Sequence, residues 1–493
     1  MDTNITNEAR HENAGNLVAD LNTNLSDFAL AKLFIERHGQ DLRYVAKWKK
    51  WAVWGGEIWE KDNSKAYQKL MDFITKVYID GGTEFVRHQG NCKHQNDIVT
   101  FIRRIQNGTN AEKILTFASR FAEVQAEPDD FDADPWLLVC QNATINLAQG
   151  RAKLKGSKSR GDGLNSEFAF KRHDMVTMRA AVSWDRKADC PLWLDHLDLV
   201  FAGDQELIDY VQCLWGYSMV GMTDECIMPF AFGDGNNGKS VCWNTISGIL
   251  GDYAGLASAE MLMPRKEVDL HQQANLYRKR FVSVGEPSSN QRIAAGKIKE
   301  LTGDDRVTCR RLYENEWSFT PSHTFWCSTN HKPNVNTTDF GIWRRLKMIP
   351  FVVDISVALE AKGRKLDKHF LGKLKAEWPG IFKWLVDGAK RYKRDGLIEP
   401  KAVTDATIEY RDEEDTFKAF CSENLIVAPG LQISVREAFG LYQSEGGRLK
   451  RLGFKRKMLE VNGVSYSKAL SGGNKFKYCF FGIGSPREDW ADS

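Results

Sequence analysis

The chain has 493 residues, of which 42% are hydrophobic and 27% charged, so it is long enough for two to four globular domains with cores of their own. This composition excludes a fibre or a wholly disordered protein, and a formal net charge of +3 does not by itself indicate nucleic-acid binding. No apolar run reaches the roughly 18 residues that a membrane span needs, and residues 1–10 hold no basic and apolar leader. We therefore expect a cytoplasmic protein that has no membrane partner.

Residues 1–40 are expected to form a flexible or helical arm, because the stretch to about residue 24 is polar and rich in Asn, Asp and Glu. The run 43–59 predicts two short aromatic strands joined at a Gly-Gly turn. Its tryptophans are able to stack on bases, but a small aromatic core is the commoner explanation. Helical periodicity then covers about 64–80 and 96–124, and we assign 41–189 to one N-terminal domain.

Two carboxylates, Asp130 and Asp132, have a spacing that on a strand would bind two metal ions for polymerase-type chemistry. The flanking prolines and acids instead predict a loop, so we interpret both side chains as solvated. Residues 136–185 are typical of short strands and turns. Near residue 190 the sequence becomes strongly helical, and we place a second domain at 190–400.

A phosphate-binding loop is predicted within this second domain, because residues 231–240 fit the pattern Gly-x4-Gly-Lys-Ser/Thr at every fixed position. Its glycines permit backbone angles that aim N–H groups at phosphate oxygens, and the helix that follows adds its positive end. Lys239 would reach the β and γ phosphates, and Ser240 would ligate Mg²⁺. The predicted nucleotide contacts are Gly233, Asp234, Gly235, Asn236, Asn237, Gly238, Lys239, Ser240 and Val241.

Strands and helices alternate through the rest of this domain, which predicts a doubly wound α/β sheet. One buried strand ends at Glu286, where a parallel sheet places its active residues. A carboxylate there would polarise the attacking water and hold Mg²⁺ through its shell. Another strand ends at Asn330, and the last begins on Arg344 and Arg345.

These motifs, together with Thr302-Gly-Asp304, Ser328-Thr-Asn330 and Trp343-Arg-Arg345, occur in one order that resembles superfamily 3 helicases. More closely, the chain resembles the primase-helicase branch found in phages, plasmids, phage satellites and poxviruses. The resemblance implies an AAA+ type of fold, ATP and Mg²⁺ as cofactors, and a ring, usually hexameric, around one DNA strand. It also implies unwinding of duplex DNA in replication initiation, in the cytoplasm of the host cell if a phage or plasmid encodes the chain.

The resemblance also assigns roles at the nucleotide. Lys239 and Ser240 match the phosphate and metal ligands, Glu286 the second acidic motif, and Asn330 the polar sensor of the γ-phosphate. The chain departs from many viral members at Gly285, where they have a second acid.

An arginine supplied to the ATP of the neighbouring subunit is matched by Arg345, with Arg344 beside it. A guanidinium that arrives when the ring closes meets the charge on the γ-phosphoryl group. The choice between the two arginines stays open, with a preference for Arg345, and an exposed pair that caps the sheet is the alternative.

Two regions are predicted to contact DNA. The resemblance places a hairpin, 307–319, in the pore of the ring. Residues 448–477 contain nine basic residues against Glu460 alone, a local excess typical of a nucleic-acid footprint, although a basic protein-docking face is the alternative. The candidate DNA contacts are Lys297, Lys299, Arg306, Arg310, Arg311, Tyr313, Arg448, Lys450, Arg451, Lys455, Arg456 and Lys457.

The C-terminal region, 411–485, is expected to be a winged-helix DNA-binding domain with two helices and a β-wing. Before it, the charged stretch 411–415 predicts a linker or the start of a helix. Single-stranded and duplex DNA, further copies of the chain and a separate primase or polymerase subunit are the expected partners. Two alternatives to the helicase stay open: a DNA-stimulated ATPase that does not unwind, and the helicase subunit of a primase-helicase.

Overall fold

The computed structural model falls into two compact units. Unit 1 comprises Met1–Asn146, Arg151–Trp184 and Val307–Phe319, and unit 2 comprises Leu147–Gly150, Asp185–Arg306 and Thr320–Ser493. The structure describes residues 25–87, 92–154, 170–264, 269–285, 293–303, 305–312, 314–330, 340–447, 449–471 and 475–485. Within these ranges, none of the helices combines the length and apolar character needed to cross a bilayer.

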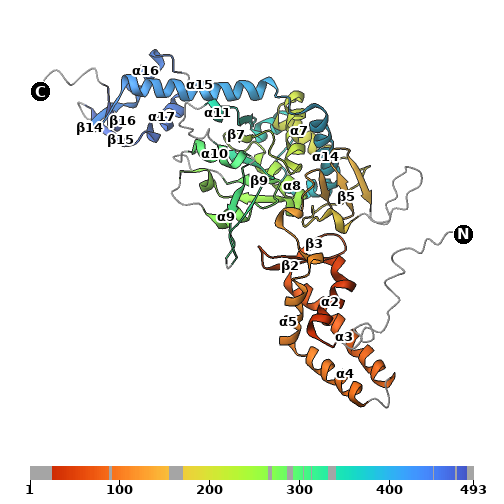
Figure 1. Cartoon of the computed structure of the whole chain (residues 1–493). Helices are drawn as coiled ribbons and strands as arrows, with labels where there is room; N and C mark the ends of the chain where they lie inside the picture. Colours follow the sequence, from red (N-terminus) through yellow and green to blue (C-terminus); the bar gives the residue numbers. More distant parts are fainter. Residues whose placement is uncertain are drawn as a thin grey trace. The chain divides into compact units, whose positions relative to one another are not determined.

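Four helices build the larger part of unit 1 (Figure 1). They are α2 (Asp27–His38), α3 (Asn63–Arg87), α4 (Cys92–Ile105) and α5 (Gly108–Ala118). Leu30 and Phe34 of α2, one helical turn apart, are fully buried, and the Phe34 ring lies 5.4 Å from that of Phe73 in α3. Helix α2 is therefore part of this core, and the boundary expected at residue 40 falls inside the unit.

Two small antiparallel sheets complete the N-terminal part of unit 1. One contains β1 (Leu42–Val45), β2 (Lys50–Trp54) and β3 (Trp59–Lys61), and the other contains β4 (Leu137–Val139), β5 (Ala143–Asn146) and β6 (Arg151–Leu154). Trp48, Trp51 and Trp59 are buried, as expected for an aromatic core. These three rings are thus unavailable for stacking on bases.

Asp132 has a structural role that differs from the expected solvated one. The residue is buried and has a positive φ of 51°. Its Oδ1 accepts the Thr177 backbone N–H at 2.8 Å, and its Oδ2 accepts the Thr177 hydroxyl at 2.6 Å. The interpretation of this side chain as solvated was wrong, since it secures the segment at Thr177, whereas Asp130 is exposed as expected.

The hairpin of β10 (Val307–Cys309) and β11 (Trp317–Phe319) forms as predicted, but it belongs to unit 1. The buried Trp317 ring lies 6.1 Å from that of Trp48 in an edge-to-face arrangement. Lys50 at the start of β2 also forms an ion pair with Glu314 at 3.9 Å. In sequence the hairpin interrupts unit 2, so the chain leaves that unit and returns to it at this point.

A five-stranded sheet organises unit 2. Its strands are β7 (Met228–Phe232), β8 (Ala254–Ala257), β9 (Phe281–Val284), β12 (Thr324–Thr329) and β13 (Leu346–Pro350), in the order β13-β7-β12-β9-β8. Every neighbouring pair is parallel, which agrees with the predicted α/β sheet. Strands β7 and β12 are buried along most of their length, as expected of a parallel sheet that helices cover on both faces.

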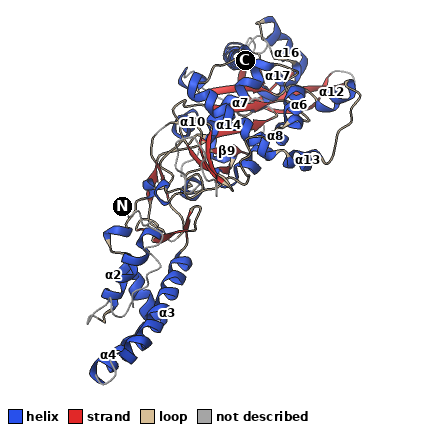
Figure 2. Ribbon diagram, turned by 90° about the vertical axis from the view of Figure 1, so that its right-hand side faces the viewer, coloured by secondary structure: helices blue, strands red, loops and turns tan. Residues whose placement is uncertain are grey.

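The helices that cover this sheet include α6 (Pro191–Val200), α7 (Gln205–Met219), α8 (Lys239–Leu250) and α14 (Trp378–Asp395). Helices α7 and α14 lie side by side in both views (Figures 1 and 2). The Trp326 indole of β12 donates to the Ser218 hydroxyl of α7 at 2.8 Å, which fixes this helix layer on the sheet. Shorter helices complete the unit: α9 (Leu270–Ala274), α10 (Ala295–Thr302), α11 (Phe340–Trp343), α12 (Ile355–Ala361) and α13 (Phe370–Ala376).

The C-terminal part of unit 2 begins with the long helix α15 (Lys401–Asn424), which leads toward the last strands in Figure 1. It continues with β14 (Ile426–Ser434), α16 (Val435–Ser444), α17 (Arg451–Glu460), β15 (Ser465–Ser471) and β16 (Lys475–Gly484). The three strands form an antiparallel sheet in the order β14-β16-β15. The charged stretch 411–415 lies within α15, so the expectation of a linker or helix start there was wrong.

A buried ion pair holds α17 against α15. Glu414 is 2% exposed and pairs with the Lys457 ammonium, which is 8% exposed and also lies 3.6 Å from a Glu460 oxygen. A charged residue is therefore tolerated at a buried position of α15, since Glu414 has Lys457 as its partner inside the domain.

We predict that Glu414→Gln destabilises the C-terminal part by about 3–5 kcal/mol, because it leaves the Lys457 ammonium buried without its main counter-charge. The double variant Glu414→Leu with Lys457→Met removes both charges and should stay within about 1 kcal/mol of wild type or exceed its stability. Urea unfolding followed by circular dichroism measures both effects. Equal losses in the single and the double variant would show that the pair has no such role.

A second prediction concerns two buried histidines, His196 in α6 and His323 before β12. Burial lowers the pKa of each from 6.5 to about 4, so both stay neutral in the folded chain. Their contribution to stability is complete above pH 6.5 and is lost as the pH falls toward 4, by about 3 kcal/mol for each histidine.

The stability of His323→Leu should therefore fall less steeply between pH 6.5 and 4.5 than that of the wild type. Neither ring nitrogen of His323 has a hydrogen-bond partner among the described residues, so the substitution leaves no described group unpaired. Urea midpoints measured across this range give the comparison, and parallel curves would contradict the assignment.

Candidate functional site

The predicted phosphate-binding loop joins β7 to α8, in the strand, loop and helix order that the sequence indicated. The loop has tight backbone requirements at its glycines. A Cβ on Gly233 would lie 1.9 Å from the Phe351 carbonyl oxygen. Gly238 has a φ of 82°, and a Cβ there would lie 2.8 Å from side-chain carbons of Ile355 and Val200. Only glycine fits at these two positions.

Two asparagines fix this loop to the chain that follows β13. The Asn237 amide donates to the Phe351 carbonyl at 2.8 Å, and Asn237 is 4% exposed. The Asn236 amide donates to Asp354 Oδ1 and Ser356 Oγ, each at 2.7 Å. The loop is therefore held on one side by the segment that follows β13.

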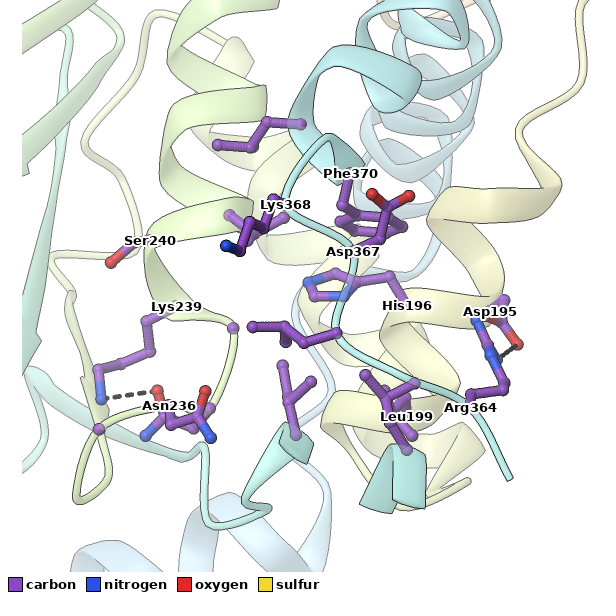
Figure 3. Close-up of a pocket in the computed structure, with 18 of the residues that line it drawn as sticks. Asp195, His196, Leu199, Asn236, Lys239, Ser240, Arg364, Asp367, Lys368 and Phe370 are labelled. Carbon is purple, nitrogen blue, oxygen red and sulfur yellow. Dashed lines mark hydrogen bonds and ion pairs between the residues drawn. The ribbon is translucent and has the colours of Figure 1, made fainter. Parts of the chain in front are cut away.

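Lys239 lies at the start of α8 with its ammonium directed back into the loop (Figure 3). Its Nζ donates to the Gly233 carbonyl at 2.8 Å and to Asn237 Oδ1 at 3.1 Å, and it lies 3.5 Å from Asn330 Oδ1. Asn330 follows β12, which pairs with β7 in parallel, so both residues lie at the carboxyl edge of the sheet. The predicted lysine and the predicted sensor asparagine thus converge.

A pocket of about 540 Å³ opens beside the loop, within the size range of small-molecule sites. The loop residues from Gly235 to Val241 line one end, with Asn330 and the exposed Ser240. Figure 3 shows Ser240 and Lys239 at this end. Backbone amides, an ammonium and a hydroxyl are donors and ligands suited to phosphate and Mg²⁺.

The other end of the pocket, which we call the apolar end, combines apolar side chains with charged ones such as Asp367 and Lys368. Leu199, Ile355, Phe370 and Leu371 line it together with His196. The Asp195 carboxylate receives two hydrogen bonds from Arg364, at 3.0 and 2.7 Å, which join α6 to the segment before α13 at the rim. This hydrogen-bonded guanidinium lowers the pKa of Asp195, so the carboxylate keeps its charge.

His196 connects this wall to the loop. Burial lowers the pKa of His196 to about 4, although a hydrogen bond to the Gly238 backbone partly opposes that change. Its Nε2 lies 3.8 Å from Cys242 Sγ in α8, and its ring centre lies 5.3 Å from that of Phe370. The neutral imidazole packs against the loop at Gly238 without adding a charge.

Sequence reasoning missed this wall. His196 and Asp195 fell within a stretch predicted only as helical, and Arg364 and Phe370 belong to no motif. Their role depends on the tertiary approach of α6 to the segment before α13. No local signal in the sequence marks that approach.

The two candidate arginines differ clearly in the structure. Arg345 is partly buried, and its guanidinium donates to Thr302 Oγ1 at 3.2 Å and to the Gly341 carbonyl at 2.9 Å. Arg344 is exposed. Neither lines the pocket of its own chain.

Several predicted residues are placed outside this pocket or outside the described residues. Asp234 is exposed and Gly233 is buried, and neither of them lines the pocket. Glu286, Tyr313 and Arg448 lie outside the described residues.

The predicted DNA contacts are divided between the units. Arg310 and Arg311 are exposed on the hairpin of unit 1, whereas Lys297, Lys299 and Arg306 belong to unit 2. The Lys297 ammonium forms an ion pair with Glu300 at 2.6 Å.

On the C-terminal part, Lys450 and Arg451 are exposed, and Lys455 and Arg456 are half-buried. Lys457 is buried and paired with Glu414. We therefore correct the predicted set by leaving Lys457 out, because its charge is committed inside the domain.

Two models of known protein families match parts of the chain. Residues 31–202 match the family model described as "D5 N terminal like", and residues 231–345, which include the loop and Asn330, match a "Family of unknown function (DUF5906)".

Several viral proteins are similar to parts of this chain. The protein named "Putative helicase L207/L206" of Acanthamoeba polyphaga mimivirus is 29% identical over 238 residues, which cover 45% of this chain and 25% of that protein. "Putative helicase 022R" of Frog virus 3 is 26% identical over 247 residues, 46% of this chain and 25% of the relative. "Putative primase C962R" of African swine fever virus is 21% identical over 407 residues, 76% of this chain and 41% of the relative.

The chain therefore spans a quarter of the mimivirus and frog virus proteins that it matches. Among solved structures, the apo NrS-1 C-terminal region covers 92% of this chain and 98% of its own at 10% identity, with a TM-score of 0.45, which is too low to establish a shared fold. The D5 N-terminal-like region and the viral relatives together support a likeness to D5-like primase-helicases.

Proposed function

We propose that this chain binds ATP with Mg²⁺ beside the phosphate-binding loop and uses ATP hydrolysis to unwind DNA in the replication of a viral or satellite element. The convergence of Lys239 and Asn330 at the end of a pocket of about 540 Å³ carries this proposal. The helicase names of the mimivirus, frog virus and Sputnik virophage relatives support the DNA-directed part.

The two ends of the pocket suit the two ends of the nucleotide. The amides from Gly235 to Ser240 and the Lys239 ammonium would surround the β and γ phosphates. The base would enter the apolar end at Leu199 and Phe370. Asn330 would contact the γ-phosphate and so distinguish ATP from the product.

The residues available for Mg²⁺ fit the ion's preference for oxygen ligands. The Ser240 hydroxyl is exposed at the phosphate end, and we keep Glu286 as the acid that orients the attacking water. When bound, Mg²⁺ neutralises charge between the β and γ phosphates.

We propose Arg344 rather than Arg345 as the arginine that serves a neighbouring subunit. The Arg345 guanidinium has two partners within its own chain, whereas Arg344 is exposed and is not among the residues that line the pocket of its own chain. An exposed arginine of this kind is available to the ATP of another copy, which favours a closed ring, as a hexamer would provide. Arg345 would then position the segment that bears Arg344.

Two further functions are alternatives: a DNA-stimulated ATPase that does not unwind DNA, and the helicase subunit of a primase-helicase. A DNA-stimulated ATPase that remodels nucleoprotein would need the same pocket, and strand displacement on a forked substrate separates it from a helicase. The African swine fever virus relatives bear the name primase, but the shared region spans 41% of their length, and we assign no priming activity to it.

Replacement of Lys239 by alanine should lower ATP hydrolysis about 100-fold or more, because the γ-phosphoryl loses its ammonium partner. DNA binding should change less than about twofold, since the basic surfaces lie elsewhere in sequence and structure. Phosphate release and fluorescence anisotropy measure the two effects, and an unfolding curve shows whether the fold persists.

Lys401→Ala is the matched control, because this lysine is 83% exposed and pairs only with Asp405 in the same helix among its described partners. Its hydrolysis rate should equal that of wild type. Undiminished turnover in Lys239→Ala would contradict the nucleotide site.

The arginines make a separate prediction. Arg344→Ala should bind nucleotide normally and unfold like wild type, yet hydrolyse ATP at least about 100-fold more slowly. Arg345→Ala should lose about 1–2 kcal/mol of stability, because two hydrogen bonds from a charged donor disappear.

Mixing Arg344→Ala with Lys239→Ala protein should restore part of the activity, since sites then form that contain one intact lysine and one intact arginine. Hydrolysis and urea unfolding are measured at several ratios. If Arg345→Ala abolishes turnover at full stability while Arg344→Ala does not, the assignment is reversed.

A further inference from the structure

Two tyrosines and two lysines form a compact surface on the C-terminal part, which we call the aromatic–lysine surface: Lys455, Tyr466, Lys468 and Tyr478. The rings of Tyr466 in β15 and Tyr478 in β16 are stacked, with centroids 5.3 Å apart and planes within 2°. Lys455 Nζ of α17 lies 3.5 Å from the Tyr466 centroid, and Lys468 Nζ of β15 lies 5.5 Å from the Tyr478 centroid. One ammonium therefore lies over each ring.

The strand register explains why these side chains share a face. Lys468 pairs directly with Tyr478, and Tyr466 pairs directly with Phe480, so all four side chains project from the same side of the hairpin. Phe480 is fully buried and belongs to the core of this part, with its ring 6.1 Å from that of Tyr466. The face is thus anchored at one end, while Tyr478 at the other end is 50% exposed.

The charge around this face is strongly one-sided. Between residues 449 and 485 the sequence contains one acid, Glu460, and that carboxylate lies 3.6 Å from the buried Lys457. The buried pair of Glu414 and Lys457 removes one lysine from the surface. Exposed or half-exposed basic side chains remain, among them Lys450, Arg451, Lys455, Lys468 and Lys477.

An exposed tyrosine ring beside ammonium groups is suited to the base and the phosphate of an unpaired nucleotide. Stacking of a base on an aromatic ring is stronger than an exposed cation–π contact, so a base is able to displace the Lys468 ammonium from Tyr478. The displaced ammonium then lies within reach of the adjoining phosphate. Paired bases inside a duplex present no free face to such a ring.

We propose that the aromatic–lysine surface binds single-stranded DNA by stacking an unpaired base on Tyr478 and contacting the neighbouring phosphates with Lys468 and Lys455. This inference rests on the proposed function for its choice of DNA as the partner. It goes beyond the DNA-binding domain expected from the sequence, because the ring rather than the basic charge alone decides what binds.

The test uses the full chain and a fluorescent 20-nucleotide oligothymidine, with a duplex of the same length as the comparison. Tyr478→Ala should weaken binding of the single strand about tenfold, the loss expected for one base stack, and change duplex binding less than about twofold. Tyr478→Phe keeps the ring and should bind the single strand like wild type. Lys468→Ala should weaken single-strand binding and reduce its dependence on salt concentration.

Tyr78→Ala serves as the matched control, because Tyr78 in α3 has the same 50% exposure but lies in unit 1. Its binding of the single strand should equal that of wild type. Unchanged single-strand binding by Tyr478→Ala, or equal losses for single strand and duplex, would overturn the proposal.

The DNA-independent ATP hydrolysis of Tyr478→Ala is measured in parallel and should equal that of wild type. A wild-type chain that stacks bases but hydrolyses no ATP would sink the proposed function and leave this inference standing. If the wild-type chain hydrolyses ATP but Tyr478→Ala weakens binding of the single strand and the duplex equally, this inference fails and the proposed function stands.

Discussion

The shape of the phosphate-binding loop depends on the chain that leaves β13. Strand β13 pairs with β7 along its full length, with Pro350 opposite Phe232, so the two chains leave the sheet together. The Phe351 carbonyl then accepts the Asn237 amide, and the Ile355 N–H donates to the Asn236 carbonyl at 2.9 Å. The loop is shaped by contacts from an element more than 100 residues later, as well as by its own glycines.

This dependence extends to the rest of the pocket. Helix α6 precedes the loop in sequence and supplies His196 and Leu199, whereas Arg364 comes from the segment before α13 and Phe370 from the first residue of that helix. The ion pair between Asp195 and Arg364 joins the two where they meet. The phosphate end is thus built on strand ends of the sheet, whereas the apolar end is built from peripheral helices that the sheet only brings together.

The strand, loop and helix at residues 228–250 were predictable from the sequence because the signal there is local, while phosphate binding stays a prediction. Two fixed glycines, a lysine and a serine within ten residues indicate both a backbone shape and a chemistry, and Asn330 follows from its place at a strand end. Alternating strands and helices also predicted the parallel sheet. The strand order, with β12 between β7 and β9, could not be predicted from local sequence patterns, because it depends on which distant strands pair with each other.

The apolar end and the role of Asp132 were not predictable for a related reason. Asp132 sits among acids and prolines that indicate a solvated loop, and only the approach of Thr177, 45 residues later, turns it into a buried acceptor. Composition cannot distinguish the two outcomes. The placement of the hairpin of β10 and β11 was likewise not predictable from local sequence. The hairpin lies between segments of unit 2 in the sequence, yet Trp317 packs against Trp48 in unit 1.

The C-terminal part shows how folding selects among charges that look equivalent in sequence. Lys455, Arg456 and Lys457 are consecutive, yet only Lys457 turns inward to Glu414, while Lys455 lies over the Tyr466 ring. One turn of helix therefore commits one charge to the core and directs another to an aromatic face. Because an ion pair buried in this way contributes little to a long-range field, the electrostatic attraction for a polyanion comes from the remaining side chains. In the proposed binding of single-stranded DNA, specificity would arise where charge and an exposed ring coincide, which a count of basic residues cannot locate.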